Sequence, residues 1–230
     1  MRLLGSPSRL LEGLVMNVRG FDKIPKYVLK GTTTIGVVCR DGIIFATDTR
    51  ATMGYFVAHK RAKKVLKIDD HLAMTIAGAV GDAQAVVEIL KANASLYRYE
   101  NGKPIPVRAA ATLLANLLFS SRIAPLLLQA ILGGVDDSGA HIFAVDPLGS
   151  LTEEKCVSTG SGSPVAYGVL ESEFKEGMTE KEALPVVIRA VGSAMKRDSA
   201  SGDSFDVAVV TREGYRELRE DEKKAVLANA

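Results

Sequence analysis

The chain has 230 residues, 47% of them apolar and 24% charged, a composition that is ordinary for a soluble globular protein and sufficient for a buried core. The net charge of +2 gives no reason to expect nucleic acid as a partner, and no apolar run approaches the roughly 18–20 residues that a membrane span needs. The two cysteines, Cys39 and Cys156, show neither a disulfide framework nor metal-ligand spacing, so we expect buried free thiols, compatible with a reducing cytoplasm.

Charge is distributed unevenly along the chain. Residues 1–31 hold six basic and two acidic residues, whereas the rest of the chain holds 23 basic and 25 acidic residues. The same segment shows no sustained hydrophobic period, and its short apolar stretch around Glu12 makes a poor signal peptide. We therefore expect residues 1–31 to be a loosely structured leader, part of which is never translated if Met16 is the true start.

Strands and then helices are expected after the leader. The strand segments are rich in β-branched residues and are separated by turn-forming residues, which indicates hairpins. The expected strands in this group are Thr33–Cys39, Ile43–Thr47, Val65–Ile68 and Leu72–Ala77. From Asp82, a candidate N-cap, apolar residues recur at intervals of three and four, and a second such stripe begins near Pro106. The two stripes predict two helices.

The second half of the chain repeats the order of strands and helices. Its expected strands are Gln129–Gly133, Ile142–Val145, Leu151–Val157 and Phe205–Thr211. A helix is expected from Ser163 to about Phe174, and another begins with a capping box at residues 179–182. Pro185 is expected to kink that helix or shift its first turn. Hairpin-linked strands with helix pairs between them predict an α+β fold, a four-layer αββα sandwich with two antiparallel sheets between helix pairs.

The junction of Gly31 and Thr32 is the first candidate for chemistry. Cleavage between them would make Thr32 an N-terminal residue, whose hydroxyl is a nucleophile and whose own α-amine is a base. Glycine suits the preceding position, because self-cleavage needs a bent backbone that glycine tolerates at little steric cost. An ordinary first strand explains the same residues, since threonine is common in strands.

Three further polar features join this junction. Asp48 ends the second expected strand, and hairpin pairing could return it toward Thr32. One lysine of the pair Lys63-Lys64 could point inward and form a charged pair with Asp48 near the nucleophile. Two hydroxyl-rich loops, residues 158–163 and 197–202, could place hydroxyls and amides around a charged terminus. Taken singly, each feature also has an ordinary explanation as a solvated strand end or a turn.

In combination, these motifs resemble the proteasome β subunits, most closely those of archaeal type. The resemblance extends from Gly31 to about Thr211. The matching segments are Gly31–Gly36, Ala46–Arg50, Lys63–Val65, Thr75–Gln84, Ser158–Pro164, Tyr167–Glu171 and Arg197–Gly202. The resemblance implies the N-terminal-nucleophile hydrolase fold, a propeptide of residues 1–31 that is removed by autocatalysis, and a catalytic domain of residues 32–230.

The resemblance also implies catalytic roles for the matching residues. Thr32 would be the nucleophile, Lys64 would lower the proton affinity of its hydroxyl and amine, and Asp48 would orient and neutralise Lys64. The network around the Thr32 amine would consist of Ser161, Asp198 and Ser201. No metal, nucleotide or other cofactor is expected at the site.

A substrate site is implied in the same way. The backbone amide of Gly78 would donate to the developing oxyanion, and Thr52 would bind the substrate backbone as an added strand. The pocket for the side chain before the cut bond would be formed by Ala51, Ala62, Leu66, Ile76 and Val80. None of these residues is charged, so we expect cleavage after apolar residues.

The implied function is that of a catalytic β subunit of a 20S proteasome, a threonine endopeptidase of the cytoplasm. Its implied partners are proteasome α subunits, other β subunits in a seven-membered ring, an ATPase regulatory complex and unfolded protein substrates. The main alternative is a structural or partner-dependent β subunit with little activity of its own. Two others are a small-molecule amidase of the same fold, against which the segments around Ser161 and Asp198 argue, and an α subunit, against which Thr32 argues.

Overall fold

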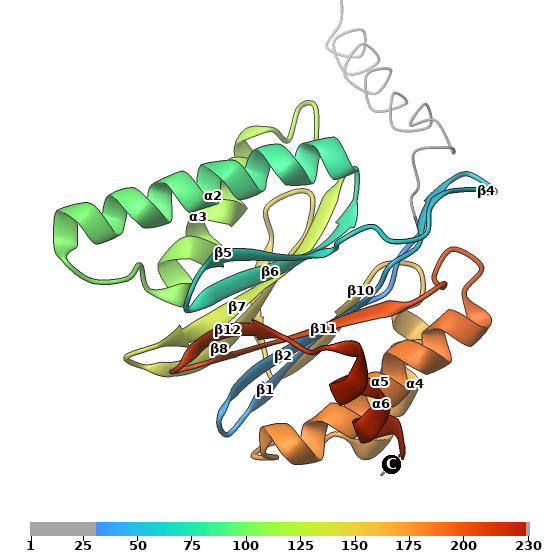
Figure 1. Ribbon diagram of the computed structural model, residues 1–230. Coiled ribbons are helices and arrows are strands. Elements are labelled where there is room, and N and C mark those ends of the chain that lie inside the picture. Colours follow the sequence, from blue (N-terminus) through green and yellow to red (C-terminus); the bar gives the residue numbers. More distant parts are fainter. Residues whose placement is uncertain (1–30, 229–230) are drawn as a thin grey trace, which may run out of the picture.

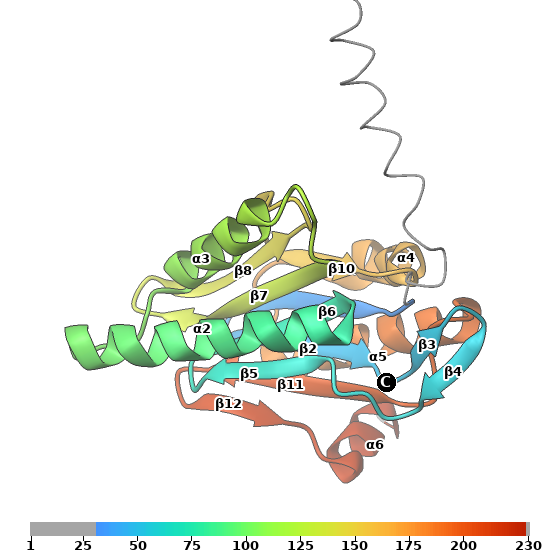
Figure 2. The same ribbon diagram turned by 90° about the horizontal axis from the view of Figure 1, so that it is seen from above.

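The computed structural model describes residues 31–228, and these residues form four layers (Figures 1 and 2). Two antiparallel sheets of five strands lie face to face in the middle, and a pair of helices covers the outer face of each. This arrangement confirms the αββα sandwich expected from the order of the elements. Residues 1–30 of the expected leader lie outside the described part of the chain.

One sheet contains the strands that follow the Gly31–Thr32 junction. Its members are β1 (Thr34–Cys39), β2 (Gly42–Asp48), β10 (Cys156–Thr159), β11 (Phe205–Thr211) and β12 (Gly214–Glu217). They lie in the order β10-β1-β2-β11-β12, and every neighbouring pair is antiparallel. Helices α4 (Ser163–Glu173) and α5 (Glu180–Arg197) cover the outer face, and the short α6 (Glu220–Ala228) contacts α5. The central strand is β2, and all of its residues are buried.

The other sheet lies under the two remaining helices. Its members, in spatial order, are β5 (Val65–Asp69), β6 (Leu72–Gly78), β7 (Leu128–Asp136), β8 (Gly139–Val145) and β9 (Leu151–Glu154). Helices α2 (Val80–Asn101) and α3 (Val107–Ser120) cover it. A separate hairpin of β3 (Ala51–Met53) and β4 (Phe56–His59) projects from one end of the molecule (Figures 1 and 2).

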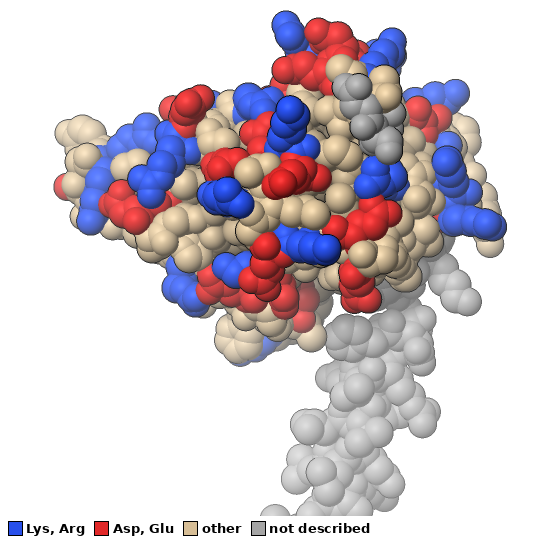
Figure 3. Space-filling view, turned by 90° about the horizontal axis from the view of Figure 1, so that it is seen from below, with Lys and Arg blue, Asp and Glu red and all other residues tan. Residues whose placement is uncertain are grey.

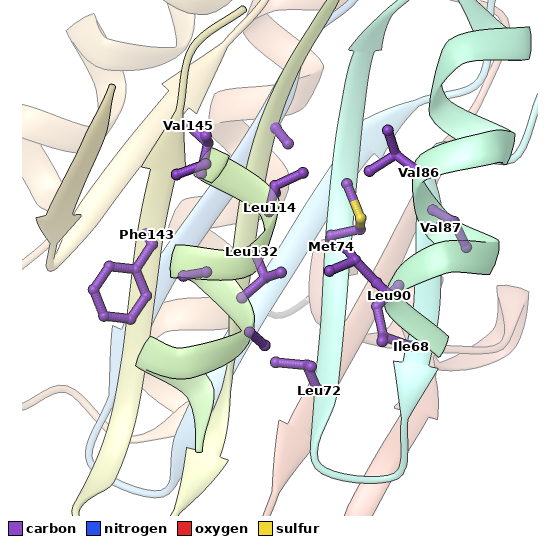
Figure 4. Close-up of a cluster of buried hydrophobic side chains, with 14 of the residues drawn as sticks. Ile68, Leu72, Met74, Val86, Val87, Leu90, Leu114, Leu132, Phe143 and Val145 are labelled. Atoms are coloured by element: carbon purple, nitrogen blue, oxygen red, sulfur yellow. The ribbon is translucent and has the colours of Figure 1, made fainter. Parts of the chain in front are cut away.

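The core consists of three apolar layers, one between the sheets and one under each helix pair. Side chains of the second sheet such as Met74 pack against Leu90 of α2 and Leu114 of α3 (Figure 4). Because strand side chains alternate between faces, Phe45 of β2 lies between the sheets while Ala46 lies on the α5 side. Each large buried side chain contributes about 1.5–3 kcal/mol, so the sandwich provides a rigid support for the strand ends.

One expected strand, Leu151–Val157, is wrong as a single element. The structure ends β9 at Glu154 and begins β10 at Cys156, and the two strands belong to different sheets. Lys155 lies at the crossing, where its carbonyl accepts a hydrogen bond from Val38 N at 2.8 Å. Both halves are suited to strands, so the sequence pattern gave no sign of the change of sheet.

Other boundaries differ from the expectation as well. Helix α2 begins at Val80 with Ala79 as its N-cap, so Asp82 lies in the first turn, where it accepts a hydrogen bond from Leu127 N at 2.9 Å. The β3–β4 hairpin, β12 and α6 were not expected. Cys39 is buried as expected, whereas Cys156 is only half-buried. Burial raises the pKa of each thiol to about 12, which leaves both thiols protonated and unreactive at neutral pH.

The capping box of α5 is confirmed. Thr179 Oγ1 accepts from Glu182 N at 3.4 Å, and Glu182 Oε2 accepts from Thr179 N at 2.8 Å. The helix continues through Pro185 to Arg197. None of the helices within residues 31–228 combines the length and the apolar character needed to cross a bilayer.

Candidate active site

Thr32 lies just before β1, with its side chain between those of Asp48 and Lys64. Its Oγ1 donates a hydrogen bond to Asp48 Oδ1 at 2.8 Å, and Lys64 Nζ donates to the same Oγ1. Lys64 Nζ also lies 2.6 Å from Asp48 Oδ1, so the three side chains form a closed triangle. The exposed fractions are 2% for Thr32, 0% for Asp48 and 6% for Lys64. Charge interactions in this triangle are therefore screened little by water.

Strand pairing brings Asp48 to Thr32. The strands β1 and β2 are antiparallel, with Thr34 opposite Thr47. Asp48, the last residue of β2, consequently reaches the residues just before β1, and its backbone N donates to Thr33 O at 3.1 Å. The geometry agrees with the expectation that the hairpin returns Asp48 toward Thr32.

The two lysines of the Lys63-Lys64 pair point in opposite directions. Lys64 directly precedes β5, and its carbonyl accepts a hydrogen bond from Ile76 N on β6 at 3.0 Å, which fixes its backbone. Lys63 is more than half exposed and pairs with Glu217 at 2.5 Å. Lys64 is thus the lysine that enters the site, as the resemblance implied.

Asp48 is the most highly connected side chain of the site. It accepts five hydrogen bonds, with donor–acceptor distances from 2.6 to 3.1 Å. The donors to Oδ1 are Thr32 Oγ1, Thr33 N and Lys64 Nζ, and the donors to Oδ2 are Arg50 N and Gly202 N. All five donors point at a group that only accepts, which is what an ionised carboxylate offers.

Burial of the ammonium group lowers the pKa of Lys64, and the neighbouring carboxylate of Asp48 opposes that shift. Desolvation penalises the charged form of lysine, whereas a negative charge 2.6 Å away favours it. The desolvation effect is the larger, so Lys64 releases its proton more readily than an exposed lysine. A cation held in this way stabilises negative charge on Thr32 Oγ1, to which it donates.

A second polar network surrounds the backbone nitrogen of Thr32. That nitrogen donates to Ser161 Oγ at 3.1 Å, and Ser161 Oγ donates to Asp198 Oδ2 at 2.6 Å. Ser201 Oγ donates to the same oxygen at 2.6 Å and is fully buried. The structure therefore brings together the six expected catalytic residues: Asp48 and Lys64 lie on the hydroxyl side of Thr32, and Ser161, Asp198 and Ser201 lie on its nitrogen side.

The residue before Thr32 has no room for a side chain. A Cβ atom at Gly31 would lie 1.8 Å from the Cβ of Ala200 and 2.8 Å from Ser161 Oγ. Heavy atoms that are not bonded do not approach so closely, and Ala200 has no flexible side chain that could move away. Glycine is therefore required here by the close approach of the loop after α5.

A cavity of about 620 Å³ opens beside Thr32. Five of the expected substrate-binding residues line it, and these are Ala51, Ala62, Leu66, Ile76 and Val80. Gly78 lines it too, with a φ of +133°, and a Cβ there would lie 2.0 Å from the carbonyl oxygen of Leu127. The cavity combines an apolar surface with direct access to Thr32.

Thr52 is the one expected substrate-binding residue that does not line the cavity. Its side chain is 4% exposed, and its hydroxyl has no hydrogen-bond partner within the described residues. It lies on β3, which pairs with β4 along one edge, with Thr52 opposite Val57. In the two-stranded sheet the other edge of β3 has no strand beside it.

Sequence reasoning missed Arg50 and the basic rim of the cavity. Arg50 Nε donates to Asp203 Oδ2 at 2.9 Å and Arg50 Nη1 donates to Ser199 O at 2.9 Å, so Arg50 holds the loop that follows Asp198. Its place at the end of the matching segment Ala46–Arg50 was the available signal. The basic rim contains His59, Lys60, Arg61 and Lys63.

The layer order and the position of Thr32 define the class of protein first. Two antiparallel sheets between helix pairs are the layer arrangement of the N-terminal-nucleophile hydrolase fold, and a threonine just before the first strand contacts an Asp–Lys pair. Within residues 31–228 there is no group of three or more His, Cys, Asp and Glu residues that could hold a metal ion.

Comparison with known proteins identifies the family. A family model described as "Proteasome subunit" matches residues 28–210, and the chain belongs to this family. A "Proteasome subunit beta" of Methanothermobacter thermautotrophicus is 52% identical over 205 residues, covering 89% of this chain and 98% of the relative. Proteins of the same description from Methanocaldococcus vulcanius and Methanosarcina barkeri are 53% and 50% identical, covering 87% of this chain and 91% and 96% of their own lengths. The chain is therefore a β-type member of a family whose β subunits are generally threonine proteases.

Proposed function

We propose that this chain is an active threonine endopeptidase whose nucleophile is Thr32, released when the Gly31–Thr32 bond is cleaved. The observation that carries the proposal is the buried triangle of Thr32 Oγ1, Asp48 and Lys64 at the mouth of an apolar cavity. Burying the charge of a lysine is costly, and the start of an ordinary strand gains nothing that would offset this cost. Beside a nucleophile, the buried cation stabilises the alkoxide that forms.

In the proposed maturation step, Thr32 Oγ1 attacks the carbonyl carbon of Gly31. The bond from that carbon to the Thr32 nitrogen breaks, the nitrogen takes up the proton that Oγ1 gives away, and the leader is left as an ester on Oγ1. Water then hydrolyses the ester, which frees the leader carboxylate and restores the hydroxyl. The steric limit at Gly31 supports the proposal, since it keeps the preceding backbone close to the nucleophile.

In the mature enzyme the freed amine of Thr32 would serve as the base. It would take the proton of Oγ1 as Oγ1 attacks a substrate carbonyl, and give it to the departing amine of the peptide. Lys64 favours the neutral form of the amine by charge repulsion. The hydroxyls of Ser161 and Ser201, both bound to Asp198, would hold the amine in place.

The amide of Gly78 is the proposed oxyanion donor. Backbone N–H groups of a strand alternate between its two edges, and Ile76 N donates to Lys64 O on the β5 side. The amide two residues later is expected on the same side, past the last paired residue of β5, Val65 opposite Thr75. At that point the cavity and Thr32 lie beside β6.

The substrate is proposed to lie as an added strand beside β3. The edge of β3 without a neighbouring strand supports this, and the backbone of Thr52, not its side chain, would make the contact. The residue before the cut bond would enter the cavity, where Ala51, Ile76 and Val80 favour apolar side chains. We therefore propose faster cleavage after Leu, Phe or Tyr than after Arg or Glu.

Assembly and partners complete the proposal. The chain would act inside a 20S particle, with α subunits and other β subunits in a seven-membered ring, on unfolded proteins delivered by an ATPase regulatory complex in the cytoplasm. The alternative is a β subunit that needs a partner type for its activity or serves the ring alone. The presence of Thr32, Asp48 and Lys64 favours the active subunit, since each has a partner in the triangle.

The test is to co-express the chain with α subunits and measure its intact mass and its hydrolysis of fluorogenic peptides ending in Leu or Tyr. The proposal expects a product that begins at Thr32, and no cleavage or activity in the Thr32→Ala variant. An uncleaved chain in assembled particles would support the structural alternative. Faster hydrolysis of peptides ending in Arg or Glu would refute the apolar preference alone.

A further inference from the structure

The lining of the cavity beside Thr32 has charge of one sign only. It includes five Lys and Arg residues and one histidine, and it contains no Asp or Glu. On the molecular face shown in Figure 3, by contrast, basic and acidic side chains are interspersed. The apolar part of the lining suits the residue before the cut bond, so the cations at its rim require a separate explanation.

Three of the five cations are already neutralised. Arg50 pairs with Asp203 at 2.9 Å, and the ion pairs of Lys63 and Lys64 are described above. Lys60 and Arg61 are exposed and form no direct ion pair within residues 31–228; Asp203 and Glu220 act on them only through charge interactions at longer range. The positive charge available to a ligand at this site is therefore that of Lys60 and Arg61.

These two residues are held at the rim by hydrogen bonds of their backbone. Thr49 Oγ1 donates to Lys60 O at 2.8 Å, and Ala62 N donates to Thr49 O at 2.8 Å. Thr49 itself is buried, with its N bonded to Ser204 O at 2.9 Å. The segment that carries the two charges is thus tied to the end of β2, on the same support as Asp48.

The periodicity of an extended substrate decides which of its residues meets these charges. Successive side chains of a strand point to opposite faces. If the residue before the cut enters the cavity, the third residue before the cut points to the same side, about 6.5–7 Å further along. The second residue before the cut points away.

We propose that Lys60 and Arg61 form a subsite for an acidic side chain, Asp or Glu, at the third substrate residue before the cut. This inference rests on the proposed endopeptidase activity and names the substrate class that the site prefers: an acidic residue, any residue, then an apolar residue. The substrate carboxylate supplies the direct ion-pair partner that neither residue has within residues 31–228. Exposed ion pairs are weak, so each cation contributes about a two- to threefold preference, and the pair about a four- to ninefold preference.

The test compares kcat/KM of the assembled particle for three fluorogenic peptides that end in Leu. Glu stands at the third position before the cut in one, at the second position in another, and nowhere in the last, where both positions are Ala. The expected ratio of the first peptide to the last is about four to nine, and that of the second to the last is near one. Raising the salt concentration from about 0.02 M to 0.5 M should reduce the first ratio, because salt screens exposed charges.

The Lys60→Glu/Arg61→Glu variant should reverse the preference, so that a peptide with Lys at the third position is cut faster than the Glu peptide. The matched control, Lys155→Glu/Lys181→Glu, changes the net charge equally at exposed positions that do not line the cavity. The control variant should show the same ratio of kcat/KM for the Glu and Ala peptides as the parent particle. Equal kcat/KM for Glu and Ala at the third position, or a ratio that the control alters as much as the rim variant, overturns the subsite. A particle that cuts none of the peptides refutes the endopeptidase proposal instead.

Discussion

Replacing Asp48 by asparagine tests the central pair of the site. The change keeps the size of the side chain but removes its negative charge and turns one acceptor into a donor. If the remaining oxygen takes the place of Oδ1, the new NH₂ group faces the amides of Arg50 and Gly202, which donate to Oδ2 at 3.0 and 3.1 Å. Two hydrogen bonds are then lost, and Lys64 keeps a buried charge without a counterion.

The expected destabilisation is large for a single substitution. Removing one partner of a buried ion pair costs about 3–5 kcal/mol. For a domain of this size, each kcal/mol lowers the melting temperature by about 2–4 °C, so we expect a loss of about 6–20 °C. An amide oxygen is also a weaker acceptor for Thr32 Oγ1 than a carboxylate oxygen, so the Gly31–Thr32 bond should remain largely uncleaved.

The pH dependence gives a second readout. Without Asp48 the pKa of Lys64 falls further, while in the unfolded chain it keeps its ordinary value of 10.5. Between these two values the unfolded chain binds more protons, so the stability of the variant rises with pH. The destabilisation should therefore be smaller at pH 9.5 than at pH 7.

Thermal unfolding of the purified chain and its intact mass measure these effects. The control is Asp70→Asn, which removes a mostly exposed carboxylate paired with Lys67 and should leave the melting temperature nearly unchanged. A melting temperature of Asp48→Asn within about 2 °C of the parent chain, or normal cleavage before Thr32, would refute the reasoning that Asp48 is indispensable to the site.

Three further predictions follow from the glycines and from Lys64. Gly31→Ala should leave the leader attached, because its Cβ would overlap that of Ala200, whereas Gly168→Ala, where a Cβ meets nothing within 4 Å, should mature normally; intact mass distinguishes them. Gly78→Ala should lower both the melting temperature and peptide hydrolysis, since its Cβ would lie 2.0 Å from a carbonyl oxygen, and an active variant of unchanged stability would contradict this. Peptide hydrolysis should decline on the alkaline side below pH 10.5, because burial lowers the pKa of Lys64 and its charge is lost as the pH rises; a rate that stays constant up to pH 10.5 would exclude the assigned role.

The parts of the fold that could be predicted are those with a sustained period. The α2 stripe includes Ala83, Val86, Val87 and Leu90, all buried in the structure at the expected spacing. The hairpin of β1 and β2 also agrees with its turn signal, and its register explains why Asp48 lies beside Thr32. A long helix or strand that buries one face can be predicted from its own residues, because their apolar spacing matches the period of the element.

The missed elements depend on tertiary contacts. The strands β3 and β4 have three and four residues, too few for a period, and their apolar residues Met53 and Phe56 are exposed rather than buried. The change of sheet at Lys155 depends on how the chain passes from one sheet to the other, which the local residue pattern does not specify. Helix α6 has a buried lysine, Lys223, whose Nζ donates to Phe205 O at 2.7 Å. From the sequence, a lysine in a charged segment is expected to be exposed to solvent, so the packing of this helix was not predicted.

The site residues, unlike the missed elements, could be predicted from their chemistry and from the family resemblance before their contacts were known. What the sequence could not provide was the mode of contact. Thr52 was expected at the substrate through its residue type, but its hydroxyl is buried and only its strand edge is available. Likewise, Arg50 acts through Asp203 and Ser199, which are distant in the sequence.

The uncut junction bears on how activity is withheld before maturation. With Gly31 joined to Thr32, Thr32 Oγ1 contacts Asp48 and Lys64, and its nitrogen contacts Ser161. Under the proposed function, cleavage therefore needs no rearrangement of these residues. What it changes is the nitrogen itself, because an amide lone pair is delocalised into the carbonyl and cannot accept a proton as an amine can. The precursor would then be inactive toward other peptides for a chemical reason, because the α-amine that serves as the base exists only after the Gly31–Thr32 bond is cleaved.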